Sequence, residues 1–145
     1  MQVKVPEVAE VLGGRKALGR NIQSVEDLRL AVEDGLPVRS LHLAVRRIAS
    51  TSKEAAHLTF EIVPRTTLHR RRRRLSKPES ERLERLARMT ALAEEVWEDP
   101  DLAHEFLMSP QPQLGGNKPV ELADSDLGTR QVEELLYKLE YSLPA

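Results

Sequence analysis

The stretch PRTTLHRRRRRLSKPESERLERLA, residues 64–87, decides the fold. It opens with Pro64, whose fixed φ suits the first position of a helix, and the residues up to about Leu75 contain no helix breaker. A joint follows at Lys77, and a longer helix is predicted from Glu79, with Leu and Ala mostly on one face and charged residues mainly on the other. Two helices separated by a short joint are therefore expected, the first containing five consecutive arginines.

Three more helices are predicted upstream, because capping residues precede apolar residues at helical spacing. Ser24 and Thr51 are typical N-caps, each with an acid three positions later, and Gly35 is suited to end the first of these helices. The first twenty residues are expected to form a flexible lead-in, since Gly14 and Gly19 have phosphate-loop spacing but the Lys and Ser or Thr of such a loop are absent. The three predicted helices cover residues 25–34, about 41–50 and 52–58.

Downstream, the long helix is expected to end at about Asp99. The pattern then predicts a short helix around residues 102–107, a Pro- and Gly-rich loop at residues 109–116 and a last helix over about residues 129–141. Phe, Trp and Tyr make up only 3% of the 145 residues, so the core must consist of Leu, Val and Ala, which favours helix packing. These features predict an all-α protein.

The composition also bounds the environment and the partners. There is no cysteine, so disulfides and thiolate metal sites are excluded. Residues 1–12 lack the apolar core of a secretory signal, and no run approaches the roughly 18 apolar residues of a membrane span, so a cytoplasmic location without a membrane partner is expected. Residues 1–75 hold 15 Lys and Arg against 8 Asp and Glu, whereas residues 76–145 hold 7 against 15. The basic half is expected to meet a polyanion, and two solvated halves of opposite charge are the alternative.

The arginine run follows a capped helix and a short turn, which is the order of a helix-turn-helix unit that reads DNA. Successive helical residues are rotated by about 100°, so five arginines surround the axis. Leu68 marks the core-facing side, with Arg71 and Arg72 beside it. From there, the two arginines are expected to reach phosphates or acids such as Glu81 and Glu84. Outward-facing Arg and Thr suit base edges in the major groove. The predicted DNA contacts are Arg65, Thr66, Thr67, Arg70, Arg73 and Arg74.

Further motifs complete a recognisable pattern. A Gly-Leu-Pro turn occupies residues 35–37, a Leu-Gly-Gly-x-x-Pro loop occupies residues 114–119, and a closing helix with an apolar stripe begins near Gly128. The downstream motif residues are Trp97, Ala103, Phe106, Leu107, Leu114, Gly115, Gly116, Pro119, Val132, Leu135 and Leu136. Together with the stretch at residues 64–87, these motifs resemble the antitoxins of the Xre/MbcA/ParS family over about residues 11–141.

The resemblance implies the antitoxin of a type II toxin–antitoxin pair. Its parts would be an N-terminal lead-in at residues 1–20, an Xre-like helix-turn-helix region at residues 21–77 and a small C-terminal helical toxin-binding domain at residues 78–145. It also implies a homodimer that binds double-stranded operator DNA and represses its own operon. The toxin would be a RES-domain enzyme that degrades NAD, whose active site the antitoxin covers. The antitoxin itself is expected to have no catalytic activity and no cofactor.

The C-terminal end is the expected toxin contact. It is amphipathic and ends in a carboxylate, which suits a plug inserted into an electropositive cleft. A frayed terminus with no binding role is the alternative. The predicted toxin contacts are Tyr137, Tyr141, Ser142, Leu143, Pro144 and Ala145.

A stand-alone helix-turn-helix regulator with an acidic dimerisation domain is the main alternative function, and an adjacent gene for an NAD-consuming enzyme would discriminate between the two. RNA binding is less favoured, because no aromatic side chains surround the arginines to stack bases. Trp97 and Phe106 are expected to anchor the core. The histidines lack metal-ligand spacing, so no metal or catalytic site is predicted. They are expected to cap helices or face solvent, and are His42, His57, His69 and His104.

Overall fold

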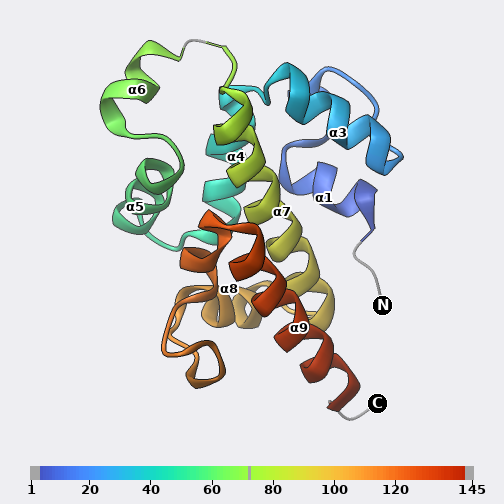
Figure 1. The fold of residues 1–145 in the computed structure, drawn as a ribbon, viewed down its shortest axis with the longest axis vertical. Coiled ribbons are helices and arrows are strands. Elements are labelled where there is room, and N and C mark those ends of the chain that lie inside the picture. The colour runs from blue at the N-terminus through green and yellow to red at the C-terminus, as the bar shows by residue number, and fades with distance from the viewer. Residues whose placement is uncertain (1–3, 72, 143–145) are drawn as a thin grey trace.

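The computed structural model describes residues 4–71 and 73–142, and the described residues form helices and no β-strand (Figure 1). The predicted all-α class is therefore confirmed. None of the helices in these ranges is both long and apolar enough to cross a membrane. The α-helices are α1 (Val5–Val11), α2 (Gly14–Leu18), α3 (Val25–Asp34), α4 (Val38–Ile48), α5 (Ser52–Ile62), α6 (Arg65–Arg70), α7 (Lys77–Trp97), α8 (Pro100–Met108) and α9 (Asp126–Ser142), with 3₁₀ helices η1 (Pro112–Leu114) and η2 (Pro119–Asp124) before α9.

Helix α7 runs through the middle of the molecule and contacts α1, α3, α8, α9 and η2 (Figure 1). It begins with a capping box, in which Ser76 accepts a hydrogen bond from the Glu79 backbone and the Glu79 carboxylate accepts one from the Ser76 backbone. The helix therefore starts two residues before its predicted position, because a proline is tolerated in a first turn whose N–H groups have no helical partner. Its leucines, such as Leu83 and Leu92, are fully buried.

The predicted flexible lead-in is wrong, since this segment forms α1 and α2 and belongs to the core. Val8, Leu12 and Leu18 are buried against the other helices. The glycines serve as helix joints: Gly13 has φ +100°, and a Cβ there would lie 2.5 Å from the Cβ of Ala17. The glycine spacing thus reflects a tight turn between two short helices.

Helices α3, α4 and α5 confirm the three predicted upstream helices. Their starts at the Ser24 and Thr51 caps are as predicted, but α5 continues to Ile62, one turn beyond its expected end. Gly35 ends α3 with φ +95°, and a Cβ there would lie 2.5 Å from the carbonyl oxygen of Leu75. The joint between α3 and α4 therefore packs directly against the segment that follows α6.

The predicted helix across the arginine run is wrong beyond Arg70, where α6 ends. The chain then becomes extended, and residues 73–75 lie antiparallel to residues 36–38. The Val38 N–H donates to the carbonyl of Arg73 (2.9 Å), and the Leu75 N–H donates to that of Leu36 (2.8 Å). These bonds satisfy backbone groups without a helix, while like charges four positions apart, at Arg70 and Arg74, would disfavour continuing one. The helical-face geometry predicted for the later arginines therefore does not hold.

The C-terminal part follows the predicted order. The loop at residues 109–116 is irregular apart from η1, and α9 starts three residues earlier than expected. Arg85 of α7 donates to the carbonyl oxygens of Ala123 (2.9 Å) and Asp124 (3.2 Å), which fixes η2 and the start of α9. The stripe that includes Val132 and Leu136 is buried, as its spacing predicts.

Candidate nucleic-acid and partner-binding sites

The basic end of the molecule is built from α5, a two-residue turn and α6. The Thr51 hydroxyl caps α5 by accepting a hydrogen bond from the Glu54 N–H (3.1 Å). Ile62, at the end of α5, and Val63, in the turn, are both buried. Helix α6 itself has no buried residue, and it lies to one side of α7 (Figure 1). The order of helix, short turn and helix is that of a helix-turn-helix unit, and the second helix is largely exposed.

The predicted DNA contacts divide into two groups. Arg65, Thr66, Thr67 and Arg70 lie on α6, where Thr67 is half-buried and the others are exposed. The guanidinium carbon of Arg65 lies 4.4 Å from the centre of the Phe60 ring, a cation–π contact that orients it.

The remaining arginines lie beyond α6. Arg73 and Arg74 are exposed in the extended segment, and Arg74 Nη1 also donates to the carbonyl of Gly35 (2.9 Å). Arg71 forms an ion pair with Glu79 (3.0 Å) rather than with the acids expected from sequence. Burial would raise the pKa of Glu79, but the hydrogen bonds from Arg71 and Ser76 hold it below its usual value. Arg72 lies outside the described residues.

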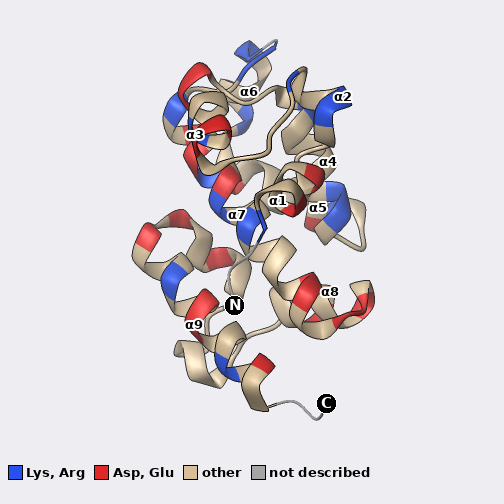
Figure 2. Ribbon diagram, turned by 90° about the vertical axis from the view of Figure 1, so that its right-hand side faces the viewer, with Lys and Arg blue, Asp and Glu red and all other residues tan. Residues whose placement is uncertain are grey.

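Charge is distributed unevenly over the fold. Figure 2 shows Lys and Arg mainly on the part that carries α2, α5 and α6, and Asp and Glu mainly on α8, α9 and α3. Helix α3 is thus an acidic element within the basic half of the sequence. Most of the positive charge therefore lies on the part of the molecule that carries α2, α5 and α6 (Figure 2).

His104 of α8 joins the C-terminal part to the turn between α4 and α5. Its Nδ1 is hydrogen-bonded to the carbonyl oxygen of Ile48, and its Nε2 lies 2.8 Å from the Ser50 hydroxyl. Because a carbonyl only accepts, Nδ1 carries the proton. His104 thus caps the C-terminal end of α4, one of the two roles expected for the histidines, since Ile48 is the last residue of that helix. Helix α4 is also linked to α7 by a bidentate ion pair, in which Arg47 donates to the two carboxylate oxygens of Glu94 at 2.8 and 2.7 Å.

The predicted toxin contacts occupy the end of α9. Tyr137 is half-buried, and its burial raises the pKa of its hydroxyl. Tyr141 is 78% exposed, and Ser142 donates to the carbonyl of Leu139 (3.1 Å). Leu143, Pro144 and Ala145 lie outside the described residues. The two tyrosines are four residues apart and so lie on the same side of α9.

The aromatic pair of the C-terminal part behaves as a core anchor. Phe106 is buried, Trp97 is partly buried against the core, and their ring centres lie 6.1 Å apart. Among residues 4–71 and 73–142, no group of three or more His, Asp and Glu side chains is arranged to hold a metal ion.

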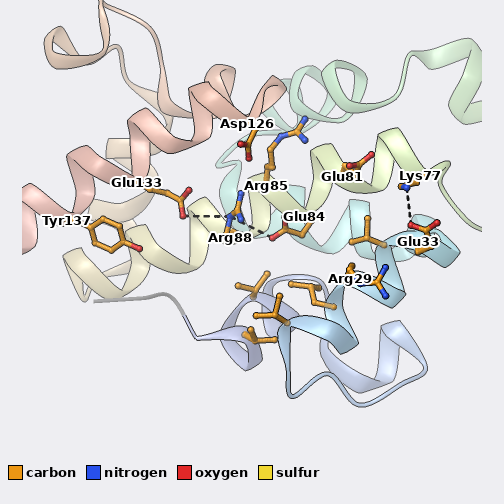
Figure 3. Close-up of a pocket in the computed structure, with 15 residues that line it drawn as sticks. Arg29, Glu33, Lys77, Glu81, Glu84, Arg85, Arg88, Asp126, Glu133 and Tyr137 are labelled. Carbon is orange, nitrogen blue, oxygen red and sulfur yellow. Dashed lines mark ion pairs between the residues drawn. The ribbon is translucent and has the colours of Figure 1, made fainter.

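Sequence reasoning missed a charged cluster inside the fold. Glu84 and Arg88 were expected on the solvent face of the long helix, yet both are half-buried between α7 and α9 (Figure 3). The signal was their spacing of four residues next to the apolar stripe, which places them together at the edge of the core.

Two family models match consecutive regions of the chain. Residues 27–88 match the antitoxin Xre-like helix-turn-helix domain. Residues 92–141 match the C-terminal toxin-binding domain of the Xre/MbcA/ParS antitoxins. The chain belongs to the Xre/MbcA/ParS antitoxin family, which confirms the resemblance seen in the sequence.

The chain is also similar to a single curated protein whose name refers to the same kind of antitoxin. The chain is 37% identical over 82 residues to the protein named Antitoxin Xre of Pseudomonas putida, an alignment that covers 54% of this chain and 52% of that protein. The chain thus spans about half the length of this curated relative.

Proposed function

We propose that the protein is the antitoxin of a type II toxin–antitoxin pair, which binds and inhibits a toxin and also binds DNA. The observation that carries the proposal is the match of two consecutive regions to an Xre-like helix-turn-helix domain and to a toxin-binding domain. The displayed helix α6, with Arg65 and Arg70 exposed, supports the DNA-binding part. The proposed division into residues 1–20, 21–77 and 78–145 assigns the two activities to different parts of the chain.

The DNA-binding part of the proposal is autorepression. Arg65, Thr66 and Arg70 would approach base edges and phosphates from α6, and Arg73 would contact the adjacent phosphates from the extended segment. A homodimer would present two copies of α6 to a palindromic operator, whose half-sites lie one or more helical turns apart.

The toxin-binding part of the proposal is that the end of α9 covers the active site of a RES-domain toxin that degrades NAD. Tyr137, Tyr141, Ser142 and the residues after them would enter the cleft. The acidic C-terminal half suits a cleft that accepts the anionic pyrophosphate of NAD. The antitoxin would act by binding, without catalysis or a cofactor, in the cytoplasm.

Co-expression with the product of the neighbouring gene tests the proposal. We expect the neighbour alone to stop growth and deplete cellular NAD, and co-expression with this chain to restore both, with co-purification of the two proteins. A neighbour that is harmless, or toxic regardless of this chain, would reject the antitoxin assignment and favour a stand-alone helix-turn-helix regulator.

Deletion of residues 142–145 tests the C-terminal plug. The truncated chain is expected to lose toxin inhibition and to retain operator binding, because α6 lies far from this end of the sequence and at the other end of the fold (Figure 1). Full neutralisation by the truncated chain would reject the plug.

A further inference from the structure

A groove of about 670 Å³ lies between α1, α3, α7 and α9 (Figure 3). One wall is apolar and includes Val5 and Val8 of α1 and Leu28 of α3. Val25, at the start of α3, also lines the groove and is 71% exposed. The opposite wall, from α7 and α9, is mainly charged, and α3 also contributes the charged Arg29 and Glu33 to the lining. The groove is thus amphipathic, with an apolar side and a charged side facing each other.

The positive charges in this groove are already engaged. Lys77 pairs with Glu33 (3.0 Å), Arg29 pairs with Glu26 (2.6 Å), and Arg85 donates to the backbone at the start of α9. Among these cations, Arg85 lowers the pKa of Glu84 through its charge, but burial raises that pKa more.

The negative charges are poorly compensated. Glu84 and Glu133 share the guanidinium of Arg88 at 3.8 and 3.7 Å, which is longer than a hydrogen bond (Figure 3). The Nε of Arg88 is buried without a hydrogen-bond partner among the described residues. Burial raises the pKa of both carboxyl groups, which means that their charged forms are under-stabilised. Two further acids, Glu81 and Asp126, line the groove and are exposed, and Asp126 has the guanidinium of Arg130 at 3.9 Å.

We propose that the groove receives an amphipathic segment of the toxin, with apolar side chains against α1 and α3 and a Lys or Arg beside Glu84, Asp126 and Glu133. This inference rests on the proposed function. Charge complementarity selects a basic segment, since an added cation would compensate the shared carboxylates. The α9 wall lies within the region that matches a toxin-binding domain, and it continues through Tyr137 toward the predicted plug. The toxin contact thus extends from the C-terminus into a cleft beside the first helices.

Charge reversal at the two exposed acids tests the groove without disturbing the core. The variant Glu81→Lys with Asp126→Lys is compared with a control of equal charge change, Glu105→Lys with Glu134→Lys, whose positions are exposed and lie outside the groove. Affinity for the purified product of the neighbouring gene is measured by calorimetry. We expect the groove variant to bind roughly tenfold or more weakly and the control to bind like the wild type.

A single cysteine provides an independent readout, because the chain contains none. The thiol of Val25→Cys is expected to react with a maleimide roughly tenfold more slowly when toxin is bound, whereas Glu134→Cys on the outer side of α9 keeps its rate. Protection that depends on the concentration of this chain alone, with a change of mass in light scattering, would assign the groove to a second copy and overturn the proposal.

The outcomes separate this inference from the proposed function. Equal toxin affinity of the wild type and the groove variant would reject the groove and leave the antitoxin assignment intact. A wild-type chain that does not bind the neighbouring product would reject the proposed function and this inference with it.

Discussion

Helix α6 ends at the first residue of the arginine run and α7 begins after its last, and the two helices differ in the packing that stabilises them. Helix α7 continues for 21 residues with its leucines and alanines buried, whereas α6 ends after six residues with none buried. Arginine is a good helix former, so intrinsic propensity does not explain the early end. The difference shows that packing of an apolar stripe sustains a helix here, and that a run of charge without such a stripe does not.

Because α7 is packed in the core and α6 is exposed, substitutions in the two helices should affect different properties, stability in α7 and binding in α6. Substitutions of the buried residues of α7 should destabilise the whole molecule, because the neighbours of α7 include helices from both ends of the chain. Substitutions on α6 should change what the surface binds and leave the fold intact, since an exposed residue away from caps contributes little to stability.

The largest effect is expected for Leu83→Ala, which removes a fully buried side chain from α7. The free energy of unfolding should fall by about 2–5 kcal/mol. Urea denaturation measures the change, with Arg130→Ala on the exposed side of α9 as control. A variant as stable as the wild type would contradict the central role of α7.

The next effect concerns the bond between α7 and the joint that precedes α4. The buried Ser80 hydroxyl accepts from the Leu36 N–H (2.8 Å), so Ser80→Ala leaves a buried donor unpaired and should cost about 1–3 kcal/mol. Ser40 is a matched control, because it is also fully buried but its hydroxyl has no hydrogen-bond partner in the described part. Thermal unfolding should show Ser40→Ala close to the wild type, and equal losses in both variants would refute the assigned bond.

A smaller effect is expected for Arg70→Ala and Arg73→Ala, which are exposed and sit on either side of the end of α6. Each should weaken operator binding by about 1 kcal/mol and, where it contacts a phosphate, reduce the slope of log affinity against log salt by about 0.9. Fluorescence anisotropy at several salt concentrations measures both quantities. Operator affinity equal to that of the wild type in Arg73→Ala would exclude this residue from the interface.

The smallest effect is on the pH dependence of stability. Burial raises the pKa of Glu84 and Glu133, so the folded state binds more protons than the unfolded state between the ordinary and the raised values. Stability from these groups therefore increases as pH falls from the raised pKa values toward the ordinary value of 4.5. The opposite contribution of Glu79, whose pKa is lowered, is lost only as pH falls through its ordinary value and below.

Glu84→Gln separates these contributions. The melting temperature of the variant should rise less than that of the wild type over this pH interval, because one of the two raised groups no longer titrates. Calorimetric scans at four pH values suffice. Superimposable profiles for the two proteins would show that Glu84 titrates with an unshifted pKa.

Most of the fold was readable from the sequence where two signals agreed. Ser24 and Thr51 mark caps followed by apolar periodicity, and these helices start where predicted. The arginine run carried one signal only, the absence of a breaker, and its end was set by backbone bonds to residues 36–38 that are distant in sequence. Helices α1 and α2 were missed because glycines such as Gly13 and Gly19 indicate a flexible segment when only the sequence is considered. The core against which these two helices pack is formed by residues distant in sequence.

The candidate sites were predicted unevenly for the same reason. The exposed residues of α6 follow from local order and charge, so Arg65 and Arg70 could be named in advance. The groove could not, since it forms between α1, α3, α7 and α9, and no local pattern reports which distant helices lie close together. Glu84 and Arg88 were therefore assigned to solvent.

The two matched regions meet inside α7, between residues 88 and 92, with no linker between them. Their relative orientation is thus a matter of helical phase. One residue inserted there would turn everything after it by about 100° about the α7 axis and advance it by about 1.5 Å, whereas seven residues would nearly restore the angle. If the two matched regions were exchanged between relatives, they would have to be joined so that the helical phase of α7 is kept.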